Sequence, residues 1–200
     1  MMTNAVNASV ASRPIGIKVA VALAGALVVA GAAQVSIPVP GTTVPMTLQP
    51  LAVLVVGGLL GARFGALSLA MYLAMGAAGL PVFTPGGLPG AARLFGPTGG
   101  FLIAYPFAAA VVGRLVRWSD GPSDRPTIRP SDHPIRPFVA ATAGLATIFA
   151  GGIAQLTLVT GSGEAALALG ALPFLAKDLA SILVAGLLIR RFLPKTRALS

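Results

Sequence analysis

Apolar residues follow one another in long runs along this chain, and short breaks rich in proline, glycine or arginine separate the runs. An α-helix needs about 20 predominantly apolar residues to cross the hydrocarbon core of a bilayer. The pattern therefore predicts six transmembrane helices, over 15–33, 48–62, 64–80, 101–116, 138–159 and 172–193. The expected fold is an all-α integral membrane protein in which residues 1–200 form a single transmembrane domain.

Composition agrees with this membrane interpretation. Hydrophobic residues make up 56% of the chain and charged residues 10%, and the mean hydropathy is +0.88, values far from those of an ordinary soluble domain. A net charge of +9 would suggest a nucleic-acid partner in a soluble protein. Here the basic residues flank apolar runs, so no nucleic acid is expected and the lipid bilayer is the surrounding partner.

The distribution of basic residues predicts the orientation of the six helices. If both termini are cytoplasmic, twelve of the 14 lysines and arginines lie on the inner side, as the positive-inside rule requires. These twelve are Arg13, Lys18, Arg63, Arg114, Arg117, Arg125, Arg129, Arg136, Arg190, Arg191, Lys195 and Arg197. We therefore predict N and C termini on the cytoplasmic side.

The first apolar run carries small residues at helical spacing. Ala20 and Ala24 form one series and Ala22 and Ala26 another, and such series let a second helix approach closely. Packing within the protein and docking to a partner both remain open. A cleaved signal peptide is the alternative for this run, because small residues near its end resemble a cleavage site.

Two breaks rich in proline and glycine are expected on the outer side. Residues 34–47 contain too much proline for a helix interior and are expected to form a loop, in the manner of a lid. Residues 81–101 combine glycines and prolines in a long constrained loop, which favours a binding element. Its Arg93 is either a solvated loop charge or a partner for an anionic ligand.

The remaining breaks are expected on the inner side or at turns. A tight turn is predicted at 61–65, and a proline-rich cytoplasmic loop at 119–137, where prolines recur every four residues. His133, the only histidine, lies in that loop and has no nearby ligand or nucleophile in the sequence. Residues 161–164 are expected to form a turn before the last helix.

The last apolar run contains two charged residues, Lys177 and Asp178. Charged side chains at membrane depth are costly and usually face a cavity or a substrate path. Asp178 is too short to reach the surface, so we expect it to be part of a binding site. Because adjacent helix residues point about 100° apart, Lys177 is expected to address another part of the ligand or another helix.

The outer halves of these segments are expected to form a mostly apolar pocket for a small external molecule. Phe83, Phe101 and Tyr105 would shape it. Gln155, a polar residue in the fifth run, either faces the cavity or bridges two helices. No P-loop lysine motif is present, so the chain is not expected to bind a nucleotide.

Three motifs resemble the BioY family, the biotin-specific substrate-binding subunits of energy-coupling factor (ECF) transporters. They are Val44-Pro-Met-Thr-Leu-Gln49, Gly79-Leu-Pro-Val-Phe83 and Gly96-Pro-Thr-Gly-Gly-Phe101, in this order. The resemblance implies six helices and capture of biotin near the outer membrane face of a prokaryotic cell. It also implies a complex with a transmembrane coupling subunit and two ATPase subunits. ATP would then be used only by these partners, and the chain itself would need no cofactor.

The resemblance also implies roles for particular residues. Asp178 matches an aspartate that accepts hydrogen bonds from the ureido ring of biotin, whereas the family's lysine one turn later is replaced here by Ser181. Thr47, Gln49 and Thr98 are the polar side chains of the motifs and complete the candidate site. The family's first helix docks to the coupling subunit through small residues, which favours a partner role for Ala20, Ala22, Ala24 and Ala26.

Two other functions are considered. A carrier that works alone and is driven by an ion gradient would also use an intramembrane lysine and aspartate. An enzyme in the membrane would need a nucleophile, a base or a metal set. With five acidic residues, one histidine and no cysteine, the chain offers too few such groups, and neither catalytic activity nor a bound metal is expected.

Overall fold

The computed structural model of this 200-residue chain describes residues 14–117 and 134–196. Nearly all of its regular structure is helical, with one pair of two-residue strands. The elements are α2 (Ile15–Gln34), β1 (Ser36–Ile37), β2 (Met46–Thr47), α3 (Gln49–Ala77), α4 (Ala92–Phe95), α5 (Gly99–Arg117), α6 (Arg136–Thr160), α7 (Gly163–Gly170), the 3-10 helix η1 (Leu172–Phe174) and α8 (Leu175–Thr196).

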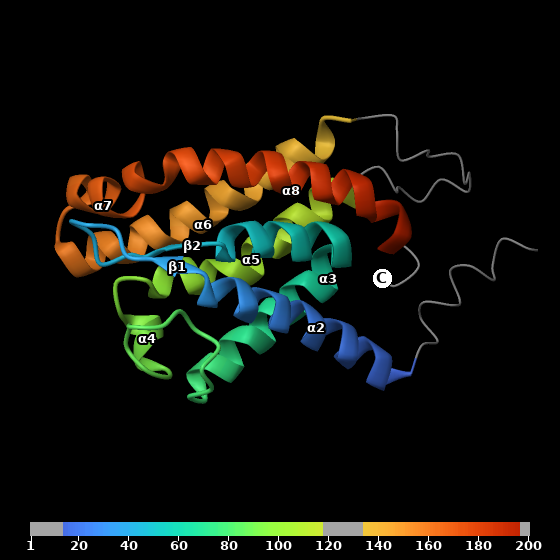
Figure 1. Ribbon diagram of the computed structural model, residues 1–200, viewed down its shortest axis with the longest axis horizontal. Helices are drawn as coiled ribbons and strands as arrows, with labels where there is room; N and C mark the ends of the chain where they lie inside the picture. Colours follow the sequence, from blue (N-terminus) through green and yellow to red (C-terminus); the bar gives the residue numbers. More distant parts are fainter. Residues whose placement is uncertain (1–13, 118–133, 197–200) are drawn as a thin grey trace, which may run out of the picture.

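Five helical stretches among the described residues are long and apolar enough to cross a membrane. They are Ile15–Gln34, Gln49–Ala77, Gly99–Arg117, Arg136–Thr160 and Gly163–Leu193. The chain is thus a multi-pass membrane protein, as the hydrophobic runs predict. The helices lie lengthwise in one bundle in which α3 and α5 pack against several neighbours (Figure 1).

The predicted turn at 61–65 is a single-residue break at Gly61. This glycine has φ 83° and ψ 175° inside the stretch assigned as α3, a conformation that residues with a Cβ rarely adopt. A Cβ on Gly65 would lie 2.9 Å from the Cα of Gly57, so the two halves of α3 fold back on each other as a tight helical hairpin. The apolar pattern correctly predicts a break here, but the predicted helices 48–62 and 64–80 meet at residue 63, whereas the structure breaks at Gly61.

The segments between the long helices contain short elements that the apolar pattern does not predict. The proline-rich loop 34–47 closes on itself through antiparallel pairing of β1 with β2. The predicted sixth helix begins late, because Pro173 and its neighbours form η1 and α8 starts at Leu175. The turn after α6 is present, with Gly161 in the left-handed region and Ser162 capping α7.

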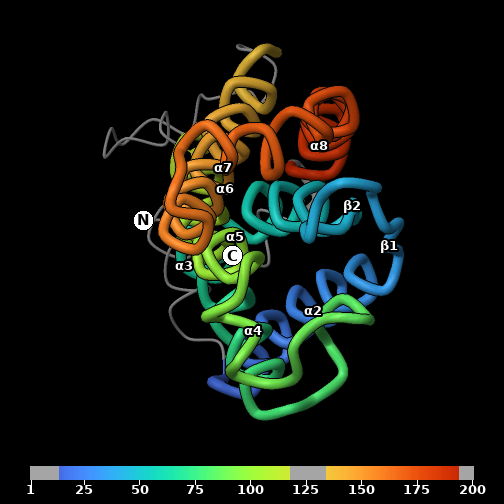
Figure 2. Tube along the Cα trace, turned by 90° about the vertical axis from the view of Figure 1, so that its left-hand side faces the viewer, coloured from blue at the N-terminus to red at the C-terminus, as the bar shows by residue number. Residues whose placement is uncertain are grey.

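These loops gather at one end of the molecule. In Figure 1 the hairpin, α4 and α7 lie at the left, whereas α2 begins and α8 ends at the right. Figure 2, which faces the left-hand end, shows the hairpin between α2 and α8 and the α4 segment beside α2. Residues 119–133 of the predicted proline-rich loop, His133 included, lie outside the described residues.

Candidate functional site

A pocket lies at the end of the bundle where the loops gather. Its walls come from the β1–β2 loop, the start of α3, the loop before α5, and helices α5, α6 and α8. The lining residues are Val44, Pro45, Thr47, Gln49, Pro50, Thr84, Arg93, Thr98, Phe101, Leu102, Tyr105, Ile148, Phe149, Gly170, Phe174, Lys177 and Asp178. The empty space between them, including the open mouth, is about 590 Å³. Its mixed apolar and polar lining is typical of a small-molecule site.

Lys177 and Asp178 together form one side of the pocket. The Lys177 ammonium forms an ion pair with Oδ1 of Asp178 and donates a hydrogen bond to the Thr47 carbonyl at 3.1 Å. The expectation that adjacent helix residues would not meet is wrong here, because the long lysine side chain bends back toward the neighbouring carboxylate. Asp178 is only 3% exposed, and among the described residues its Oδ1 has no hydrogen-bond donor of good geometry.

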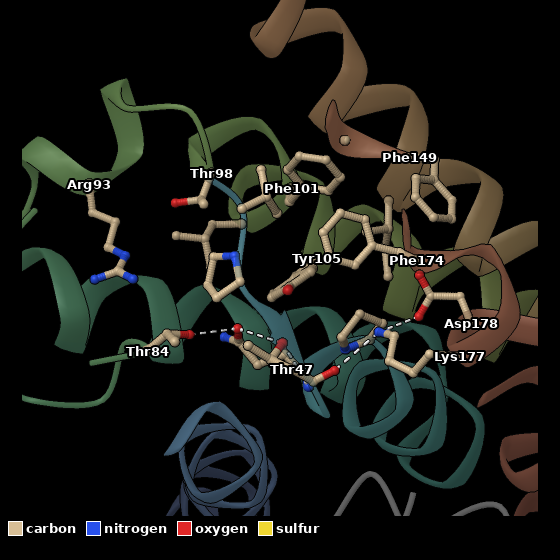
Figure 3. Close-up of a pocket in the computed structure, with 17 residues that line it drawn as sticks. Thr47, Thr84, Arg93, Thr98, Phe101, Tyr105, Phe149, Phe174, Lys177 and Asp178 are labelled. Atoms are coloured by element: carbon tan, nitrogen blue, oxygen red, sulfur yellow. Dashed lines mark hydrogen bonds and ion pairs between the residues drawn. The ribbon is translucent and has the colours of Figure 1, made fainter. Parts of the chain in front are cut away.

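A buried polar cluster lies behind Thr47 at the start of α3. The amide oxygen of Gln49 accepts hydrogen bonds from the Thr47 hydroxyl at 3.2 Å and the Thr84 hydroxyl at 3.0 Å. Its amide nitrogen donates to the Tyr72 hydroxyl at 2.6 Å. Gln49 thus joins the β1–β2 hairpin, both halves of α3 and the loop after α3. The dashed lines at Thr84 and Thr47 in Figure 3 mark its contacts on the pocket side.

Arg93 lies on the other side of the pocket from the Lys177–Asp178 pair (Figure 3). It is buried, with 7% exposure, and burial lowers the pKa of its guanidinium. The described residues include two carboxylates, Glu164 and Asp178, and neither forms an ion pair with it. Its guanidinium donates one long hydrogen bond, 3.5 Å, to the Leu88 carbonyl. Of the two interpretations left open for Arg93, the structure excludes the solvated loop charge.

Aromatic side chains cover the space between the two charged sides. The rings of Phe101 and Phe149 meet edge to face, with centroids 6.4 Å apart. A Cβ on Gly152 would lie 2.2 Å from the Phe101 ring, so this glycine in α6 gives the ring its place. Tyr105 and Phe174 complete the wall and are 3% and 4% exposed.

Two predicted site residues do not line the pocket. Phe83 packs its ring against the edge of Tyr72, 5.4 Å away, beneath the loop rather than inside the site. Gln155 donates hydrogen bonds to the carbonyls of Leu94 and Gly96 at 2.9 and 2.7 Å. It therefore bridges α6 to the loop before α5, which was one of its two predicted roles.

Some lining residues were missed by the sequence analysis. Thr84 directly follows the Gly79–Phe83 motif, and its position next to that motif was the available signal. Phe174 lies four residues before Asp178, a spacing that places two side chains on one helical face. Tyr72 does not line the pocket but accepts a hydrogen bond from Gln49, which does. It gave no signal, because it is one aromatic residue in an apolar run.

The four alanines of α2 divide into two faces. Ala22 and Ala26 are fully buried, both 0% exposed, and they pack inside the protein. Ala20 and Ala24 are exposed. The prediction of partner docking is therefore wrong for Ala22 and Ala26. Residues two positions apart in a helix point about 200° apart, so Ala22 and Ala26 face the protein interior while Ala20 and Ala24 face away from it.

No group of three or more metal-binding side chains gathers in the described part of the chain. The pocket presents hydrogen-bonding groups, the Lys177–Asp178 ion pair, aromatic surface and Arg93, which has no carboxylate partner among the described residues.

Comparison with known proteins gives one consistent family. The profile of the BioY family matches residues 2–198. The biotin transporter BioY of Thermotoga maritima is 34% identical over 166 residues, which cover 83% of this chain and 89% of that protein. A probable biotin transporter BioY of Pyrococcus horikoshii is also 34% identical, over 88% of this chain and 95% of the other.

A third relative and a solved structure extend the comparison. The biotin transporter BioY2 of Lactococcus lactis is 46% identical over 94 residues, 47% of this chain and 48% of that protein. The structure matches the crystal structure of the S-component for biotin from an ECF-type ABC transporter, with a TM-score of 0.76 and 25% identity. That match covers 88% of this chain and 89% of the other. The chain therefore belongs to the BioY family, a family of transporters and not of enzymes.

Proposed function

We propose that this protein captures biotin at the pocket and is the substrate-binding subunit of an ATP-driven ECF importer. The observation that carries the proposal is the charge arrangement of the site. Arg93 lies at one side, the Lys177–Asp178 pair at the other, and aromatic residues lie between them. Biotin has the complementary shape, with a carboxylate at one end, ureido N–H groups at the other and an apolar body between.

Each end of biotin has a partner in this arrangement. A buried carboxylate accepts charge-assisted hydrogen bonds, which are stronger than neutral ones, so Asp178 suits the ureido N–H groups. Arg93 presents a guanidinium without a carboxylate among the described residues, and guanidinium groups bind carboxylates through two parallel hydrogen bonds. Thr47, Gln49, Thr98 and Tyr105 also line the pocket and orient the ligand between these ends.

The membrane topology follows from the same bundle. If each half of α3 crosses separately, the chain has six crossings with both termini in the cytoplasm, and the pocket opens to the exterior of a prokaryotic inner membrane. The ends of α2 and α8 that face away from the pocket lie at the same side of Figure 1. Because no P-loop motif occurs in the chain, ATP would be hydrolysed by two ATPase subunits, and a transmembrane coupling subunit would connect them to this one.

Calorimetric titration of biotin into the purified protein, with ATP absent, tests the proposal. Tight binding is expected for the wild type, and Asp178→Asn should weaken it by at least about tenfold, as expected for a hydrogen bond to a charged group. Ser181→Ala is the matched control, because this buried hydroxyl donates to the Lys177 carbonyl of its own helix at 3.1 Å and does not line the pocket. No binding to folded wild-type protein would refute the biotin assignment.

A stand-alone carrier driven by a proton gradient would use the same Lys177–Asp178 ion pair as its proton site. The two proposals differ in uptake by cells. An ECF importer should continue biotin uptake when the proton gradient is dissipated and ATP is maintained, whereas a proton-coupled carrier should stop.

A further inference from the structure

Tyr72 is a buried hydroxyl-bearing residue for which the proposed function has not yet provided a role. It lies in the second half of α3, is 0% exposed and does not line the pocket. Its hydroxyl accepts the 2.6 Å hydrogen bond from Gln49, and its ring packs on Phe83. A buried tyrosine hydroxyl usually has a hydrogen-bond partner. Here that partner is Gln49, and the contacts of Gln49 therefore indicate what the Tyr72 hydroxyl does.

The partner of Tyr72 is in direct contact with two walls of the pocket. Gln49 accepts hydrogen bonds from Thr47 and Thr84, and both of these threonines line the pocket. The Thr47 hydroxyl also accepts a hydrogen bond from the Gln49 backbone N–H at 3.3 Å. The amide of Gln49 is therefore held at three points, and Tyr72 provides the only one of the three that lies outside the pocket lining.

Thr47 extends this contact to the charged side of the site. Its carbonyl accepts the hydrogen bond from Lys177 at 3.1 Å, and Lys177 is paired with Asp178. A continuous series of contacts thus runs from the Tyr72 hydroxyl through Gln49 and Thr47 to the ammonium group beside Asp178.

Removing the Tyr72 hydroxyl would leave the Gln49 amide nitrogen buried without its acceptor. An unpaired buried polar group is costly, and the amide is expected to turn toward another acceptor. The hydroxyls of Thr47 and Thr84 would then lose the oxygen that holds them. The change would reach the site although Tyr72 itself does not touch the pocket.

We propose that Tyr72 is a positioning residue for the ligand site, which acts through the Gln49 amide to hold Thr47, Thr84 and the Lys177 ammonium in place. The inference rests on the proposed biotin function, because binding is its main readout. It assigns Tyr72 no contact with the ligand.

The test is biotin titration of Tyr72→Phe, which removes one oxygen atom and retains the ring. We expect affinity to fall by about tenfold, the upper range for one lost hydrogen bond. Ser68→Ala is the matched control. Ser68 lies one turn earlier on the same helix, is 0% exposed, and donates to the Phe64 carbonyl at 2.8 Å, away from Gln49. The Ser68→Ala protein should bind biotin with the affinity of the wild type.

A double-mutant cycle separates positioning from general destabilisation. In a Gln49→Met background the Tyr72 hydroxyl has no amide to hold, so Tyr72→Phe should cause no further loss of affinity. Unchanged affinity in the single variant Tyr72→Phe, equal loss in Ser68→Ala, or full additivity with Gln49→Met would each overturn the proposal.

Hydrogen exchange of the ligand-free protein tests the positioning role of Tyr72 separately from the proposed capture of biotin. Tyr72→Phe, but not Ser68→Ala, should speed exchange in residues 44–49 and 82–84 and leave α6 unchanged. If the wild type does not bind biotin, the proposed function fails. This exchange pattern would still support the positioning role, and its absence would overturn that role.

Discussion

Arg93 shows how a single side chain can be prepared for an anion by its own loop. A Cβ on Gly87 would lie 2.3 Å from the guanidinium carbon, so the guanidinium rests flat against a backbone that only glycine provides. One of its nitrogens donates to the Leu88 carbonyl at 3.5 Å, and its other donors have no hydrogen-bond acceptor among the described residues. A buried cation of this kind favours an anionic ligand group.

We therefore expect Arg93→Gln to lower the affinity for biotin by about 10- to 100-fold, the range for hydrogen bonds to charged groups. The control is a neutral amide derivative of biotin. The wild type should bind the derivative more weakly than biotin, and Arg93→Gln should reduce its affinity little further. Calorimetric titration of both ligands checks this, and an equal loss for both would contradict contact with the carboxylate.

At the residue scale the sequence predicts which groups are unusual better than it predicts what they touch. Asp178 and Lys177 are identified because they interrupt an apolar run, which is a local property. Their ion pair depends on the bending of the lysine side chain and on the Thr47 carbonyl, 130 residues away. Phe83 is a candidate because it belongs to a motif, and Gln155 because it is polar within an apolar run. Their side chains turn to Tyr72 and to the Leu94 carbonyl, so Phe83 lies outside the pocket and Gln155 takes the bridging role of its two predicted roles.

Among the elements, α3 depends most on one backbone conformation. Gly61 allows the break at φ 83°, and the guanidinium of Arg117 packs over it, 2.9 Å from where a Cβ would lie. The Arg117 side chain also donates to the Leu59 carbonyl at 3.2 Å, near the end of the first half of α3. The sequence predicts this break from its glycines and arginine, whereas α7 and the two strands are too short for any periodic pattern.

We expect Gly61→Ala to destabilise the fold by about 1–2 kcal/mol, because an L-residue is strained at positive φ, with a further cost from the contact with Arg117. Gly31→Ala is the control, since Gly31 is helical and a Cβ there meets nothing within 4 Å. Thermal unfolding in detergent measures both. A Gly61→Ala protein as stable as Gly31→Ala would contradict the strain argument.

For the whole molecule, α2 has an inner face and an outer face. Gly25 packs so closely that a Cβ would lie 2.5 Å from the Ser68 hydroxyl, and Ala22 and Ala26 share that face. Ala20 and Ala24 remain exposed beside Leu27. Sequence spacing predicts both series but does not say which is buried, because that depends on the helix that α2 packs against.

One substitution on each face of α2 tests the separate roles of the buried and the exposed alanines. Ala22→Leu should lower the thermal stability of the isolated subunit, because overpacking a filled core typically costs about 1–3 kcal/mol. Ala24→Leu should leave stability and biotin binding unchanged and weaken assembly with the coupling subunit, measured by co-purification. Normal assembly of the Ala24→Leu protein would contradict the expectation that Ala20 and Ala24 on the outer face of α2 dock to the coupling subunit.

Arg93, Lys177 and Asp178 together also set the net charge of the pocket. Without ligand the pocket contains two cations and one anion, and so carries an excess positive charge. With a monocarboxylate bound beside Arg93 the pocket becomes electrically neutral. One elementary charge moved through 100 mV corresponds to about 2.3 kcal/mol. Binding of a monocarboxylate would therefore remove the net charge on which the membrane potential acts at this site.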